Sequence, residues 1–254
     1  MSTPFPDVSL FAPPYQALTP CADELPRACR RGHALVWYLH DAARQRDQYE
    51  WLLARPVRVP LFVVLPPANA IEPILPIVPR LSELHARGVL PNGPLPDAEP
   101  VRMLLRSAPR DLPGALTSYL TRRGMLRNSR ARSLVAKIFE LSATVPSIAG
   151  LSRRLYTSRR TLGRFFEAQG LPVPSHWLQF ARLLHVAIRL QSNERIPVFR
   201  VATQFGYPDG FTMSNQMKRL VGCRPTEVRE NLGYEWFVED WLALEGITAG
   251  AEAR

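Results

Sequence analysis

Apolar residues in the first half of the chain gather in short runs that prolines separate. The runs 34–39 and 60–65 predict buried strands, and Gly88–Leu90 predicts a third. The stretches 41–53 and 98–107 have helical composition with an apolar edge. Strands that alternate with helices are typical of a small α/β domain with parallel strands.

Prolines also set the limits of this region. Residues 71–84 are apolar but include three prolines, so a helix there is expected to begin late, near Pro79. Residues 1–32 hold six prolines and are expected to form an irregular lead-in. We therefore expect an α/β domain over 33–110 that senses a signal or dimerises, followed by a linker over 111–128.

The second half has apolar residues at helical spacing. A helix is predicted over Ser129–Leu141, and two helix-turn-helix patterns follow at 147–166 and 199–220. In the first pattern, Ser147 and Ser158 can each cap a helix. The side chains expected to face its core are Ile148, Leu151, Leu155, Leu162, Phe165 and Phe166.

The second pattern repeats this arrangement. Gly206 supplies a turn in which positive φ is favourable for glycine, and Asp209 can cap the second helix. The first helix is expected to bury Val198, Val201, Ala202 and Phe205. We expect the second helix to place Phe211, Met213, Met217 and Leu220 in the core.

A long apolar helix is predicted between the two patterns. Pro174 suits the first turn of a helix that runs to Ser192. Its apolar stripe is so wide that the helix is expected to pack on two sides. At 1.5 Å per residue it spans roughly 28 Å, close to the turn of B-DNA, about 34 Å. A rigid connector of this length suits two recognition helices that enter adjacent major grooves.

Basic charge is concentrated around the two patterns. The net charge is +10, and it divides into +4 for residues 1–127, +10 for 128–231 and −4 for 232–254. Clustered basic charge attracts phosphates, while arginine pairs bidentately with guanine, and asparagine or glutamine with adenine. Polar side chains near the start of each second helix could read bases in this way. They are Arg159, Arg160, Thr161 and Arg164 in the first pattern, and Thr212, Asn215, Gln216, Lys218 and Arg219 in the second.

Residues 129–231 resemble the DNA-binding domain of AraC/XylS-type transcription regulators. The resemblance rests on the motifs Leu155–Phe166, Trp177–Leu183, Val201–Asp209 and Met217–Pro225. It implies an all-helical domain of two helix-turn-helix subdomains joined by a linker helix, with each recognition helix in a major groove on the same DNA face. The DNA-binding residues then expected are Ser158, Arg159, Arg160, Thr161, Arg164, Gly210, Thr212, Asn215, Gln216, Lys218 and Arg219.

The chain departs from that family's pattern in several places. Tyr156 stands where a turn glycine is usual, so a wider first turn is expected. Pro208, Gly210 and Met213 replace the common serine, glutamine and phenylalanine types, which affects the base contacts of the second reader more than its fold. The first half shows no β-rich sensor pattern of the arabinose type, so the family's ligand pocket does not transfer.

The order of strands and helices in the first half faintly resembles the later half of a response-regulator receiver domain. The chemistry does not follow, because Pro66-Pro67 comes after the second predicted strand and Asn92 stands where a receiver has lysine. Phosphorylation at Asp41 is therefore not expected. No glycine-rich phosphate loop follows a strand either.

The remaining features bear on the ends of the chain and its thiols. The acidic and aromatic tail, 232–254, is expected to pack back on the protein rather than contact a partner. Cys21, Cys29 and Cys223 have no partner motif and are expected to be reduced thiols.

The sequence as a whole predicts a cytoplasmic, sequence-specific DNA-binding transcription regulator and not an enzyme. The expected partners are double-stranded promoter DNA, RNA polymerase, a second copy of the chain and an unknown effector, with no cofactor, metal or membrane. Two alternatives stay open. One is an enzyme domain in the first half, for which His33, His40, Asp41 and His85 show no metal or nucleophile spacing. The other is a protein-interaction module whose basic half docks on acidic partners.

Overall fold

A computed structural model describes residues 7–21, 30–91 and 93–247. The chain divides into two compact units, each built from two stretches of sequence. The first unit comprises residues 1–106 and 230–236, and the second comprises residues 107–229 and 237–254. None of the helices in the described ranges is long and apolar enough to cross a membrane.

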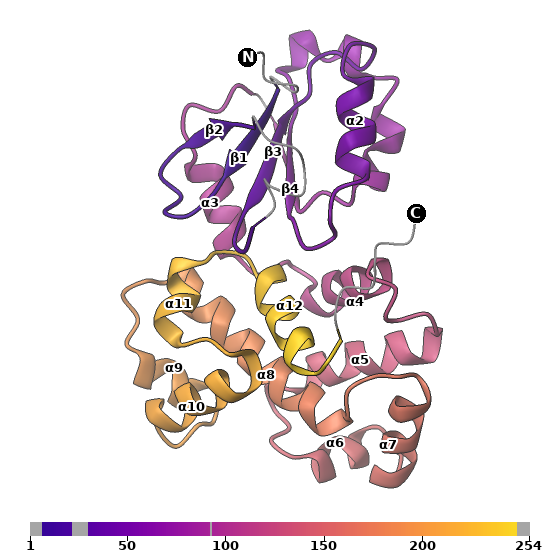
Figure 1. Cartoon of the computed structure of the whole chain (residues 1–254), viewed down its shortest axis with the longest axis vertical. Coiled ribbons are helices and arrows are strands. Elements are labelled where there is room, and N and C mark those ends of the chain that lie inside the picture. Colours follow the sequence, from indigo (N-terminus) through magenta and orange to yellow (C-terminus); the bar gives the residue numbers. More distant parts are fainter. Residues whose placement is uncertain (1–6, 22–29, 92, 248–254) are drawn as a thin grey trace. The chain divides into compact units, whose positions relative to one another are not determined.

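The first unit is built on a five-stranded mixed sheet (Figure 1). The predicted strands form as β3 (Ala34–Tyr38), β4 (Leu61–Val64) and β5 (Gly88–Leu90), which are parallel neighbours. Two further strands, β1 (Val8–Phe11) and β2 (Leu18–Pro20), complete the order β2-β1-β3-β4-β5. Both of their pairings, β1 with β3 and β1 with β2, are antiparallel.

The prediction of an irregular lead-in over 1–32 is therefore wrong, since this stretch supplies β1 and β2. These strands are only four and three residues long, and prolines lie close to both. Too few alternating positions remain for a strand pattern to stand out. The sheet is consequently mixed, and the expectation of parallel strands alone holds only for β3, β4 and β5.

The helical segments of the first unit are α2 (Arg46–Leu53) and α3 (Glu99–Arg106). Helix α2 begins later than the sequence suggested, because Asp41 first makes a local turn in which its Oδ1 accepts the N–H groups of Ala43 and Arg44. The prolines between β4 and β5 break the chain into 3₁₀ turns instead of a helix. These turns are η1 (Ala68–Ala70), η2 (Glu72–Ile74) and η3 (Val78–Leu84).

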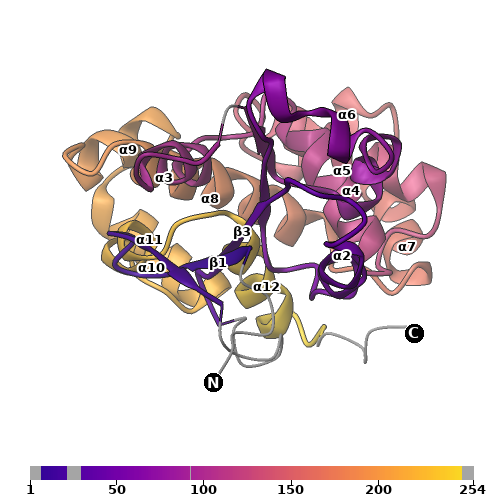
Figure 2. The same cartoon turned by 90° about the horizontal axis from the view of Figure 1, so that it is seen from above.

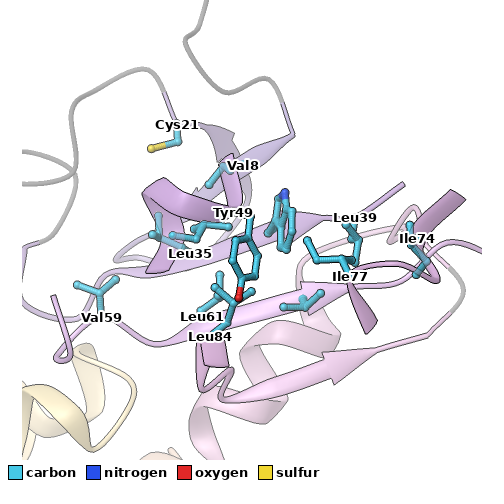
Figure 3. Packing of buried hydrophobic residues seen from close by; sticks show 13 residues of the cluster. Val8, Cys21, Leu35, Leu39, Tyr49, Val59, Leu61, Ile74, Ile77 and Leu84 are labelled. Carbon is cyan, nitrogen blue, oxygen red and sulfur yellow. The ribbon is translucent and has the colours of Figure 1, made fainter. Parts of the chain in front are cut away.

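The sheet carries a core on each face because successive side chains of a strand point to opposite sides. Helices α2 and α3 lie on different sides of β3 (Figure 2). The α2 face, shown in Figure 3, also receives Ile74, Ile77 and Leu84 from the turns between β4 and β5. On the α3 face, Val36 and Phe62 pack with Val101, Leu105 and Leu232.

The segment 230–236 is part of this first unit. The backbone N–H of Leu232 donates to Tyr15 Oη at 2.9 Å, and that hydroxyl donates to the carbonyl of Gly32 at 2.7 Å. The Arg87 guanidinium lies 4.4 Å from the ring centroid of Tyr234 and 3.8 Å from a carboxylate oxygen of Glu235. The acidic tail is thus divided between the two units, with residues up to 236 in the first and those from 237 in the second.

The second unit consists of helices. Those predicted over Ser129–Leu141 and Pro174–Ser192 form over these residues, as α5 and α8. The stretch 111–128, expected to be a linker, instead contains α4 (Leu112–Arg122), which packs on α5 inside this unit. The other helices are α6 (Ile148–Arg154), α7 (Arg159–Ala168), α9 (Val198–Gln204), α10 (Gly210–Val221), α11 (Pro225–Glu230) and α12 (Glu235–Leu244). The last residue of α11 and the first two residues of α12 belong to the first unit.

Candidate nucleic-acid interface

The first helix-turn-helix motif consists of α6 and α7, and both predicted serine caps are confirmed. Ser147 Oγ accepts the N–H of Gly150 at 3.2 Å, and Ser158 Oγ accepts the N–H of Thr161 at 3.0 Å. Each bond satisfies a backbone donor that has no partner inside its helix. Both helices therefore begin at the residue that the sequence pattern indicated.

The turn of the first motif is not wider than that of the second, contrary to the expectation from Tyr156. Four residues separate α6 from α7, and five separate α9 from α10. Tyr156 has φ 51° and Gly206 has φ 75°, so a tyrosine adopts the left-handed conformation that glycine adopts in the second motif. In both turns the following residue bonds back five positions, Thr157 to Ser152 and Tyr207 to Ala202.

The first half of α7 presents a basic surface to solvent. Leu162 and Phe166 are buried, and Phe165 is partly buried beneath the guanidinium of Arg130, which lies 5.0 Å from the ring centroid. The capping hydroxyl of Ser158 also bonds the Thr161 hydroxyl at 2.8 Å. Every residue predicted for the first reader is exposed, namely Ser158, Arg159, Arg160, Thr161 and Arg164.

The second motif consists of α9 and α10, and Asp209 caps α10 as predicted. Its Oδ1 accepts the N–H of Thr212 at 2.6 Å, and its Oδ2 accepts the Thr212 hydroxyl at 3.0 Å. These hydrogen bonds hold the pKa of the Asp209 carboxyl below its usual value, because they stabilise its charged form. Met213, Met217 and Leu220 are buried, as expected for the core side of the helix.

Phe211 does not join that core, and its assignment to the core is wrong. Its side chain is 76% exposed and occupies the second position of α10. On a helix it shares one face with Asn215 and Lys218, which are four and seven residues further on. The exposed residues of this helix face are Phe211, Thr212, Asn215, Lys218 and Arg219.

The two other residues predicted for the second reader differ from this exposed set. Gln216 is partly buried, and its Nε2 donates to Gln179 Oε1 of α8 at 3.1 Å. Gly210 is also partly buried, and a Cβ there would lie 3.6 Å from the backbone of Phe199. Beside α9, a groove of about 510 Å³ adds basic charge through Arg189, Arg195 and Arg200.

Helix α8 is the shared core of the two motifs. Trp177, Phe180 and Leu184 are completely buried within it, which confirms that it packs on more than one side. The tail supplies one of these sides, since the Trp241 ring of α12 stacks on Phe180 with centroids 4.0 Å apart and meets Trp177 edge-on at 4.6 Å. Figure 1 shows α12 across α8, with α6 and α7 toward one end of α8 and α9 and α10 toward the other.

Two acidic residues of the tail bond to basic side chains of the second unit. Glu239 accepts hydrogen bonds from Arg123 Nε at 2.6 Å and Arg123 Nη2 at 2.8 Å, and Glu245 lies 3.0 Å from His176 Nδ1. These carboxylates lie beside Phe237 and Trp241, which are buried. The prediction that the tail packs back on the protein is therefore confirmed for residues 232–247, and residues 248–254 lie outside the described residues.

The first unit holds the residues weighed for catalysis or phosphorylation. His40 Nδ1 lies 3.8 Å from a carboxylate oxygen of Asp7. The Asp41 carboxylate accepts hydrogen bonds within its local turn, and His85 directly follows η3. No group of three His, Cys, Asp or Glu in 7–21, 30–91 and 93–247 could hold a metal ion. Cys21 and Cys223 are buried thiols, whereas Cys29 and Asn92 lie outside the described residues.

Comparison with known proteins identifies the helical region. A family model described as a helix-turn-helix domain, of the AraC type, matches residues 151–231, from within α6 to just past α11. No curated protein matches the chain. The matched range holds both recognition helices and α8. The chain therefore contains an AraC-type helix-turn-helix domain, which implies DNA-binding transcription regulation.

Proposed function

We propose that the protein reads two adjacent major grooves of promoter DNA through α7 and α10. The observation that carries this proposal is the pair of capped helices, each with an exposed polar face at its N-terminal end, within one compact unit. The N-terminal residues of a recognition helix are those that reach base edges. Solvent-exposed arginines elsewhere in the unit supply the phosphate contacts that make affinity salt-dependent.

The length of α8 supports simultaneous reading. It has 19 residues, which at 1.5 Å each gives roughly 28 Å. Successive major grooves on one face of B-DNA repeat at about 34 Å. Most of α8 is buried, and its Gln179 bonds to Gln216 of α10, which supports a fixed spacing between the two readers.

The two readers differ in the bases that they suit. In α7, Arg159, Arg160 and Arg164 favour guanine, whose O6 and N7 accept a bidentate guanidinium, and Thr161 adds a hydroxyl. In α10, Asn215 favours adenine, and Phe211 can pack on the methyl group of thymine. Thr212, Lys218 and Arg219 flank them, Gly210 offers its backbone, and Gln216 positions the helix through Gln179.

We further propose that the first unit senses a signal or dimerises, and that RNA polymerase, a second copy of the chain and an effector are the other partners. The partners rest on the regulatory role that the domain implies. The first unit supplies a sheet with its own two-sided core, as a separate sensing domain requires.

The experiment that tests two-groove reading selects bound sequences from a random DNA pool with the full-length protein. We expect two conserved half-sites spaced by about one helical turn. Arg160→Ala should lose preference at particular base pairs of one half-site, and Asn215→Ala at the other, by about 1–3 kcal/mol each.

The matched control is Arg46→Ala, which removes the same charge from an exposed position of α2. It should leave both half-sites unchanged. An equal loss on selected and random DNA for Arg160→Ala would make this residue a phosphate contact. A single half-site in the selected pool would contradict the proposal.

A further inference from the structure

The first unit contains a cavity of about 280 Å³ at the carboxyl ends of its parallel strands. Tyr38 ends β3, Val64 ends β4, and Gly93 follows β5, and all three line the cavity. The loop after β4 leads to the turns on the α2 face, whereas the chain after β5 leads to α3 on the opposite face. Adjacent strands whose loops diverge in this way open a crevice where α/β sheets bind ligands.

The backbone around this cavity has little to offer an anion. Pro66, Pro67 and Pro94 have no N–H group. The N–H groups of Leu39, Leu65 and Gly93 donate to the carbonyls of Val64, Leu90 and Leu65, respectively. The N–H of His40 donates to Gln45 Oε1, and that of Ala70 donates to the carbonyl of Pro67. A phosphate or carboxylate would therefore be desolvated without compensating donors.

The side chains that line the cavity also do not suit a charged ligand. The described residues that line the cavity include no Lys, Arg, Asp or Glu. Apart from Tyr38 and His40, the lining consists of aliphatic side chains, prolines and a glycine. His40 Nδ1 lies 3.2 Å from the Tyr38 carbonyl and 3.1 Å from Gln45 Nε2. The other ring nitrogen, His40 Nε2, therefore remains for a polar group of a ligand.

The volume limits the size of an occupant. An apolar protein cavity of about 150 Å³ accommodates benzene. A cavity nearly twice that size accommodates two fused rings. We infer that this cavity is a binding site for a small, uncharged, two-ring aromatic molecule with one polar group that faces His40. The binding itself stands apart from DNA reading, whereas a role for this ligand as the regulator's effector rests on the proposed function.

Indole is a suitable probe because it is neutral, has two fused rings and carries one N–H group. Calorimetric titration of the full-length protein with indole should show saturable binding at one site. Indole-3-carboxylate keeps the rings and adds a negative charge, and it should bind at least about tenfold more weakly because the cavity offers an anion no donors. Inorganic phosphate should not bind there.

Two leucine variants locate the site. Ala70 lines the cavity from an exposed 3₁₀ turn, so Ala70→Leu should fill part of it and weaken indole binding by about tenfold or more. Ala68→Leu makes the same change on the same turn, at a residue that does not line the cavity. It should bind indole as the unaltered protein does.

Three outcomes would overturn this inference. They are no saturable indole binding, equal binding by the Ala70→Leu variant, and binding of indole-3-carboxylate or phosphate as tight as that of indole. The same preparations are assayed for binding to the selected DNA. Normal DNA reading without indole binding would defeat only the ligand site, and indole binding without sequence preference would defeat only the DNA-reading proposal.

Discussion

The two helix-turn-helix motifs share a backbone plan but carry different surfaces. Each turn has one left-handed residue and the same hydrogen bond back over five positions. The first motif uses a tyrosine there and a serine cap, and its recognition helix is rich in exposed arginine. The second uses a glycine and an aspartate cap, and it exposes the Phe211 ring together with one hydroxyl, one amide and two basic side chains.

This difference separates the buried residues, which make the fold, from the exposed residues, which we propose choose the DNA. The buried positions of α7 and α10 are apolar in both motifs, and both helices depend on the same α8. The exposed faces differ in chemistry. We therefore expect changes in the shared core to remove both readings together, and changes on one face to alter one half-site.

The largest effect is expected from Trp241→Ala, because this ring packs on two aromatic residues of α8. Truncation of a buried aromatic side chain should lower the free energy of unfolding by about 3–5 kcal/mol. Denaturant unfolding of the full-length protein measures this loss. Binding to both half-sites should fall in parallel at temperatures where the variant is partly unfolded.

Leu244→Ala is the control for this variant, since it shortens a 57% exposed side chain of the same helix. Its effect should stay within about 0.5 kcal/mol. If Trp241→Ala abolished only one half-site in a fully folded protein, the idea of a core common to both motifs would be wrong.

Substitutions in the two turns should change stability by smaller amounts and in opposite directions. Gly206→Ala forces a side chain into the left-handed region and should cost about 1 kcal/mol of stability. A Cβ at Gly206 meets no atom within 4 Å, so this cost comes from the backbone alone. Tyr156→Gly relieves the corresponding strain at an almost fully exposed tyrosine and should gain up to about 1 kcal/mol.

Thermal unfolding of the two variants measures both signs in one experiment. Tyr156→Asn provides a check on the gain, because asparagine tolerates the left-handed region and keeps a polar side chain. A loss of stability in both glycine-related variants would mean that the tyrosine ring stabilises its turn by a contact that outweighs the strain.

Much of the second unit was predictable because its determinants are local. Helix α8 begins at Pro174 and ends at Ser192 as its apolar period indicates, and three capping side chains lie one residue before their helices. Such signals depend on neighbours three or four residues away. The exposed polar faces of α7 and α10 follow from the same periodicity, which is why most predicted reader residues are exposed.

What could not be predicted depends on distant partners. Strands β1 and β2 are too short to show a pattern and form because β3 offers them an edge. The sequence does not indicate that the Gln216 amide donates a hydrogen bond to Gln179, which lies 37 residues earlier on α8. Phe211 looks like core because it is apolar, and only the packing of α10 reveals that its face is open.

The open face of Phe211 gives a prediction about base choice. If its ring packs on a thymine methyl, replacing that thymine by deoxyuridine should weaken binding by about 1 kcal/mol, the value of one buried methyl-sized group. The Phe211→Ala variant should bind thymine-containing and uracil-containing sites equally. Titration of both proteins with both DNAs completes a double-mutant cycle.

Phe199→Ala is the matched control, since this ring is 63% exposed on α9 rather than on the recognition helix. It should keep the full preference for thymine. A preference for thymine that persists in the Phe211→Ala variant would remove Phe211 from the reader and return the second half-site to its polar residues alone.

The smallest effect on stability is expected from a fall in pH, and it should arise at the second motif. The His185 ring of α8 stacks on Phe205 of the second motif with centroids 6.2 Å apart, and the first motif contains no histidine. Burial lowers the pKa of His185 below its ordinary value of 6.5, while a hydrogen bond to the Phe139 backbone opposes this shift. Protonation of His185 is therefore harder in the folded state than in the unfolded state.

The direction of the pH effect follows from this shift. Well above pH 6.5 the ring is neutral in both states, so stability is at its full value. As the pH falls below that value, the unfolded chain takes up the proton first, and stability declines until the folded state is also protonated. Unfolding temperatures between pH 7.5 and 5.5 should fall more steeply for the unaltered protein than for His185→Gln, which cannot titrate. Equal slopes for the two proteins would show that the acid response does not come from His185 and does not distinguish the two motifs.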